Sequence, residues 1–162
     1  MLNHETEVRQ FLRHTLATLS YRAGKPLREV PDGFGSFRAA PSSRTAGEIL
    51  AHVCDLLDWF LHLCRGNHVW KEAAPQDWDS DVARFFEAVR RADEFLGSDE
   101  PLGSRPGKLF QGPVADALTH VGQIAMLRRM AGAPIRGENY FKAEITPGAV
   151  GPSQAAPKVE FE

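Results

Sequence analysis

Asp116 and His120 lie four residues apart in a segment that is otherwise mostly apolar, GPVADALTHVGQ at residues 112–123. Residues at this spacing share one face of an α-helix, so a carboxylate oxygen and an imidazole nitrogen can converge on one point. A second apolar segment, residues 45–65, carries His52 among leucines, valines and aromatic residues. Two helices could therefore bring two imidazoles and one carboxylate together, which is how helix bundles build metal sites.

These residue types suit a divalent metal ion. Imidazole binds zinc, nickel, copper and iron, and a carboxylate completes a set of three ligands that leaves positions open for water or substrate. Zinc, nickel, manganese and iron all remain open as the metal. Beside the ligands, Asp55 and Gln123 are candidates for catalytic support, since they could orient the nucleophile, and Asp55 or Glu48 could fix a histidine tautomer.

The same residues also have a purely structural interpretation. A single histidine on an apolar helix, such as His52, is more often a hydrogen-bonded core residue than a ligand. An acidic residue such as Asp116 is favoured in the first turn of a helix, where it meets the positive end of the helix dipole. Spacing alone leaves both interpretations open.

Helical periodicity predicts four helices that would position these residues, over residues 3–22, 45–65, 79–96 and 113–131. Gly24 and Pro26 are expected to end the first helix. Thr45 and Glu48 have the spacing of a capping box at the start of the second. Pro113 suits the first position of the fourth helix, which Gly132 would end.

Four amphipathic helices of similar length, with no alternating pattern typical of a sheet, predict an all-α fold, a four-helix bundle. The first connection is longer than antiparallel neighbours need, which indicates a long crossover loop. We expect the bundle domain to occupy residues 1–145. Residues 146–162, rich in Gly, Pro and Ala, are expected to form an extended or mobile C-terminal tail.

Composition restricts the partners. The formal net charge of −2 and the lack of a clustered basic face argue against a nucleic-acid partner. No apolar run approaches the ~20 residues that span a bilayer, so no membrane partner is expected. The N-terminus lacks the layout of a secretory signal, and Cys54 and Cys64 read as free thiols, so we expect a cytoplasmic protein.

Two segments resemble a known family: RTAGEILAHVCDLLDWFL and QGPVADALTHVGQIAMLRRMAGAPIRGENYF. They are similar to the two signature regions of the DinB/YfiT-like superfamily of small bacterial four-helix bundles. The resemblance implies a divalent metal held by one histidine of the second helix and two of the last. His52 and His120 match two of these positions, and Asp116 stands at the third. A carboxylate there should weaken the preference for zinc or copper relative to manganese or iron.

The resemblance implies a DinB-like metal-binding protein, and we expect a metal-dependent hydrolase or thiol transferase that acts on a small molecule. In such an enzyme the metal lowers the pKa of a bound water or thiol. Trp59 could line the pocket or belong to the core, and Glu138 and Tyr140 could close over the end of the bundle or pack at the surface. The alternative is a non-catalytic dimeric bundle with a structural metal or none. Apolar surface to spare, with the Phe85–Phe86 pair, leads us to expect a homodimer.

Overall fold

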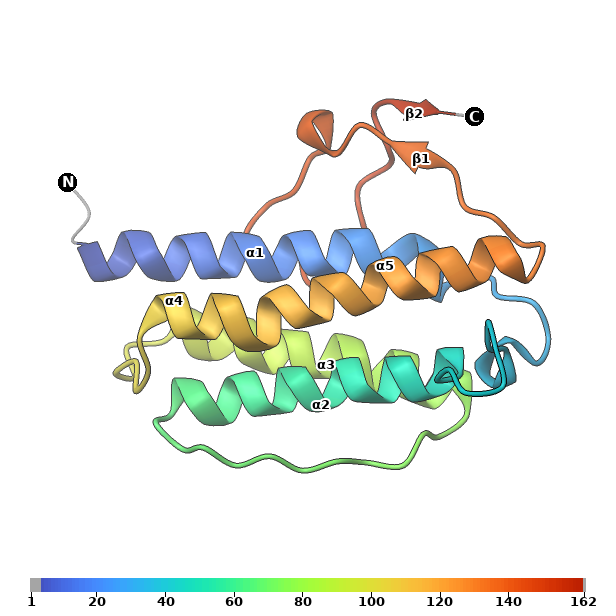
Figure 1. Ribbon diagram of the computed structural model, residues 1–162. Coiled ribbons are helices and arrows are strands. Elements are labelled where there is room, and N and C mark those ends of the chain that lie inside the picture. The colour runs from blue at the N-terminus through green and yellow to red at the C-terminus, as the bar shows by residue number, and fades with distance from the viewer. Residues whose placement is uncertain (1–3, 162) are drawn as a thin grey trace.

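The computed structural model describes residues 4–161. Four long helices, α1 (His4–Leu27), α2 (Ala46–Cys64), α3 (Trp78–Gly97) and α5 (Ala115–Met130), lie lengthwise side by side (Figure 1). The shorter elements are the 3₁₀ helices η1 (Phe34–Ser36) and η3 (Tyr140–Lys142), the helix α4 (Pro106–Leu109), the π-helical turn η2 (Phe110–Val114), and the strands β1 (Gly137–Glu138) and β2 (Glu160–Phe161). The all-α prediction is confirmed except for this antiparallel pair of strands, which is too short to show an alternating pattern.

The order of the helices around the core explains the long connections. α1 and α2 each pack against α3 and α5, so α1 and α2 lie diagonally opposite each other. α1 and α5 run in one direction and α2 and α3 in the other (Figure 1). The connection from α1 to α2 therefore crosses the end of the bundle, as its length predicted. Because α2 and α3 are parallel, the connection over residues 65–77 must run back along the whole of α2.

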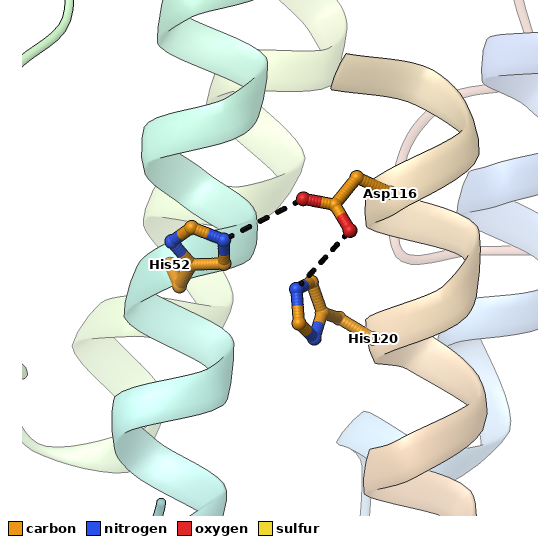
Figure 2. Close-up of side chains that lie close together, drawn as sticks. All are labelled: His52, Asp116 and His120. Atoms are coloured by element: carbon orange, nitrogen blue, oxygen red, sulfur yellow. Dashed lines mark ion pairs between the residues drawn. The ribbon is translucent and has the colours of Figure 1, made fainter. Parts of the chain in front are cut away.

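A continuous apolar core fixes α2 relative to α5. Its largest fully buried side chains come from every long helix and from η1, and include Leu16, Phe34, Leu57, Phe60, Phe85 and Ile124. Burying a leucine or phenylalanine side chain contributes about 1.5–3 kcal/mol. His52 precedes the fully buried Val53 and is itself 17% exposed. It therefore lies at the edge of this core, on the side toward α5 (Figure 2).

The predicted capping box at the start of α2 is confirmed. The Glu48 N–H donates to Thr45 Oγ1 at 3.1 Å, and the Thr45 N–H donates to Glu48 Oε2 at 2.6 Å. A cap of this kind stabilises a helix by about 1 kcal/mol. It also employs the Glu48 carboxylate at the helix end.

The prediction that Gly24 and Pro26 end α1 is wrong, because the helix continues to Leu27. Proline within the last turn removes only one hydrogen bond. The carbonyls at this end gain a distant donor instead: the Arg128 guanidinium on α5 donates to Pro26 O at 3.3 Å and to Arg28 O at 2.7 Å. Arg128 is therefore buried between two helix ends and is not a solvated residue.

The predicted start of the last helix at Pro113 is also wrong. Pro106 takes the first helical position, after Arg105, and the chain stays helical through η2 into α5. Pro113 lies inside η2, where its missing N–H interrupts the α-helical hydrogen-bond pattern. Turns of the π type change the register of the residues that follow, and they occur often at functional sites. The predicted helix end at Gly132 is confirmed by its left-handed backbone, φ 77°.

The C-terminal tail is extended over most of its length and is attached to α1. Val150 is buried, and its carbonyl accepts a hydrogen bond from Ser20 Oγ at 3.2 Å. Farther on, β2 pairs with β1, and Glu160 accepts from Lys25 Nζ at 2.7 Å. These contacts depend on side chains far away in the sequence, which a local composition cannot indicate.

Candidate metal centre

His52, Asp116 and His120 meet between α2 and α5 (Figure 2). His52 Nε2 lies 3.7 Å from Asp116 Oδ2, and His120 Nε2 lies 3.4 Å from Asp116 Oδ1. The two imidazole rings have centroids 4.8 Å apart and are nearly perpendicular, at 88°. One potential ligand atom from each residue lies within 4.8 Å of the other two. The structure thus brings together all three predicted ligands.

Two of the separations among these atoms are close to those between the ligands of a metal ion. Bonds of about 2.1 Å in tetrahedral geometry place ligand atoms about 3.4 Å from one another. The two nitrogen-to-oxygen distances of 3.4 and 3.7 Å are close to that value. Both distances exceed the usual length of an N–H···O hydrogen bond, about 2.9–3.0 Å. The widest separation in the set, up to 4.8 Å, exceeds the ~4.2 Å that two bonds of about 2.1 Å can span, so the side chains must draw together to bind one ion.

Gln123, which follows on the same helix, fixes the tautomer of His120. His120 Nδ1 lies 2.7 Å from Gln123 Oε1, and an amide oxygen only accepts, so Nδ1 carries the proton. The other ring nitrogen of His120, Nε2, faces the Asp116 carboxylate (Figure 2). Either a proton on Nε2 or a cation between Nε2 and the carboxylate would join the two groups. A hydrogen bond on the distal nitrogen is also the usual support of a metal-bound histidine.

The imidazoles are shielded from water more than the carboxylate. The side chains of His52 and His120 are 17% and 13% exposed, against 48% for Asp116. Burial, followed by the nearby His120 and Arg44, lowers the pKa of His52, and Asp116 only partly opposes this. His52 is therefore neutral at pH 7, which is the form that binds a metal.

Asp55 does not join the three ligands. It is almost fully buried, and its two oxygens accept from Arg84 at 2.6 Å and from the Ala73 N–H at 3.1 Å. These bonds hold α3 and the connection over residues 65–77 against α2. Within residues 4–161, no hydrogen bond or ion pair connects Asp55 with His52, Asp116 or His120. Asp55 does line a polar pocket of about 380 Å³ that His52 also borders.

Aromatic residues pack against His52 on the side of the connection over residues 65–77, a contact that the sequence did not predict. The Trp70 ring lies 5.6 Å from the His52 ring and 5.7 Å from that of Trp59, and Trp59 in turn stacks on His68 at 5.5 Å. Trp59 packs against the core, which is one of the two roles expected for it, and it reaches His52 only through Trp70. Trp70 and His68 belong to a connection without helical periodicity, and they reach α2 only because α2 and α3 are parallel.

Glu138 and Tyr140 lie away from the three ligands, on the outer side of α1. The buried Glu138 carboxylate accepts from the Tyr21 hydroxyl and pairs with Lys25 at 3.1 Å. The Tyr140 ring stacks under the Arg22 guanidinium, 4.0 Å from its centroid. These residues attach the segment after α5 to α1, which is the second of the two roles expected for them.

Comparison of the chain with protein-family models, with curated proteins and with solved structures finds no match. Among the helices of the described residues, none is both long enough and apolar enough to cross a lipid bilayer.

Proposed function

We propose that this chain binds a divalent metal ion through His52, Asp116 and His120 and uses it as a hydrolase or thiol transferase on a small molecule. The observation that carries the proposal is the convergence of three ligand atoms within 4.8 Å, with His120 Nε2 facing the carboxylate. A metal bound there would lower the pKa of a coordinated water or thiol, so that the nucleophile forms near neutral pH.

The protein's own residues divide the remaining tasks. Gln123 holds His120 in the tautomer that presents Nε2, and Trp70 covers His52. Asp116 is half exposed, so the open side of the site is the side of the carboxylate. Three protein ligands leave further positions for water and substrate, which is typical of catalytic sites and unlike closed structural sites.

The family resemblance supports the same proposal. The two segments similar to the DinB/YfiT-like superfamily fall on α2 and on the chain from η2 through α5, the elements that hold the three ligands. We propose that the chain is a distant member with one histidine of the set replaced by Asp116. Because a carboxylate is a harder ligand than imidazole, manganese and iron become more favourable relative to zinc.

Elemental analysis tests the proposal on tag-free protein purified without chelating resin. We expect one metal per chain in the wild type and none in His120→Ala or His52→Ala. His62→Ala is the matched control, since His62 lies on α2 outside the site and should leave the metal content unchanged. Wild-type protein that stays metal-free after incubation with zinc, nickel, manganese and iron salts would refute the proposal.

One feature favours the alternative of a dimeric bundle without catalysis. The Phe85–Phe86 pair, expected to leave apolar surface for a partner, is buried in the core, but Phe11 and Phe110 are 62% and 41% exposed and border an apolar pocket of about 370 Å³. We propose that a second copy of the chain covers this face. Light scattering should then give twice the chain mass, falling to one chain in Phe11→Gln. If the metal is purely structural, a chelator should lower the stability of the homodimer, and no water should bind the metal.

Two free, buried thiols agree with the proposed cytoplasmic location.

A further inference from the structure

An apolar groove begins beside His120 and extends between α2 and α5. Its volume is about 460 Å³, and Ile49, Met126, Leu127 and Met130 supply apolar walls, with His120 and Gln123 also in its lining. This volume lies within the approximate range of 300–1,000 Å³ that small-molecule sites occupy. The groove is therefore large enough for a ligand and adjoins the three proposed metal ligands.

The walls of the groove consist of adaptable, exposed apolar side chains. Met126 and Met130 are 55% and 51% exposed. The chain has only three methionines, so both of those beyond Met1 line this one groove. Methionine is flexible and polarisable, and it is used where a surface must fit ligands of varied shape. Exposed apolar side chains next to a polar site are typical of a binding surface.

A single formal charge lies in the lining of the groove. Arg44 lines both the groove and the polar pocket that His52 borders, so its guanidinium lies where the two meet. Within residues 4–161, no ion pair is formed by Arg44. The Thr45 N–H lowers the pKa of the Glu48 carboxylate by donating to it, and Arg44 adds to this effect without forming an ion pair. Arg44 therefore provides positive charge that a ligand can use.

We propose that this groove binds an organic anion with an apolar body, and that this anion is the substrate of the metal site. The apolar body contacts Met126 and Met130, and the acidic group pairs with Arg44. The inference rests on the proposed function in one respect, since it makes the groove ligand the substrate of that centre. The existence of the anion site itself is independent of the metal.

Binding of decanoate and decanol, measured by displacement of the fluorescent sulfonate 1-anilinonaphthalene-8-sulfonate, tests the inference. In the wild type we expect decanoate to bind about fivefold more tightly than decanol, because an exposed ion pair contributes at most a factor of about this size. Arg44→Gln should abolish this preference in metal-free protein and leave decanol binding unchanged. Met126→Gln with Met130→Gln should weaken both ligands about tenfold, since apolar burial is lost.

The matched control is Phe11→Gln with Phe110→Gln, which alters the other apolar pocket and should leave both affinities unchanged. Equal affinities of the two ligands in wild type and in Arg44→Gln would overturn the inference. So would a loss in the phenylalanine variant as large as that in the methionine variant. Light scattering on the methionine variant is a further check, because a dimer that dissociates in this variant would show that a second copy fills the groove.

Metal analysis of the same samples separates the two proposals. Metal uptake without preferential binding of decanoate would overturn the groove inference and leave the metal site intact. Preferential binding of decanoate to protein that takes up no metal would support the anion site and refute the proposed function. Circular dichroism on each variant confirms that its helical fold is retained, as expected for substitutions of exposed side chains.

Discussion

A metal that binds His52, Asp116 and His120 should raise the thermal stability of the chain, and this effect can be predicted in size. The ligands come from α2 and α5, which separate on unfolding, so the complete set exists only in the folded protein. A ligand that binds only the folded state stabilises it by mass action. The experiment therefore adds metal to the wild type and then to variants that each lack one of the three ligands.

The expected magnitude follows from the size of the chain. Free metal at a hundred times its dissociation constant contributes about 2.7 kcal/mol to folding. For a chain of 162 residues, each kcal/mol raises the melting temperature by about 2–4 °C. The melting temperature should rise by about 5–11 °C.

Differential scanning calorimetry with manganese, zinc, nickel or iron(II) measures the shift directly. His120→Ala removes one ligand and the partner of Gln123, so its melting temperature should respond little to metal. His52→Ala should behave in the same way, since only Asp116 and His120 on α5 remain. His62→Ala should keep the full shift because it removes a histidine of α2 outside the site.

Two results would refute this reasoning. One is a wild-type melting temperature that does not change with any of these metals at millimolar concentration. The other is an equal shift in His52→Ala and wild type, which would mean that the metal binds elsewhere or without the ligand from α2. A shift in melting temperature that is seen only in proteins with all three ligands would instead support metal binding between α2 and α5.

Three further predictions concern Asp116, the buried Asp55 and the two buried thiols. Asp116→His should increase the preference for zinc over manganese, measured by competitive titration, because imidazole is softer than carboxylate. Asp55→Ala should lower the free energy of unfolding by about 2–4 kcal/mol in urea, since Arg84 and the Ala73 N–H lose a charged partner, while metal content stays unchanged. If Asp55→Ala loses metal at unchanged stability, Asp55 supports the metal centre instead. Burial raises the pKa of Cys64 to about 12 and also raises that of Cys54. Above pH ~9 the unfolded thiols lose protons that the folded ones keep, so stability should fall by about 1.4 kcal/mol per pH unit for each thiol, and Cys64→Ala should reduce that slope.

The parts of the site that depend on local spacing could be predicted from the sequence. Asp116 and His120 share a helix face because four residues make about one turn, and Thr45 and Glu48 cap α2 through the same local geometry. His52 could be added because apolar helices pack along their faces. Each of these inferences needed only the few neighbours that lie in the sequence window.

The missed features depend on contacts between distant segments. α1 continues past Gly24 and Pro26 because Arg128, about a hundred residues later, donates to the carbonyls at its end. Trp70 reaches His52 because α3 is parallel to α2, and a loop sequence carries no sign of that direction. The role predicted for Asp55 left out Arg84 on α3, which lies close enough to pair with it. Proximity in the fold decides these partners.

The charges of the site and of the groove support each other. Two neutral imidazoles and one carboxylate around a divalent cation leave a net charge of about +1, where three imidazoles would leave about +2. Arg44 adds a positive charge close enough to lower the pKa of His52. A metal bound with Asp116 in the set would attract anions less strongly than one bound by three imidazoles, so Arg44 would carry more of the proposed selection for an acidic group. Arg44→Gln should therefore reduce anion preference more in the wild type than in Asp116→His, a comparison that one set of displacement titrations provides.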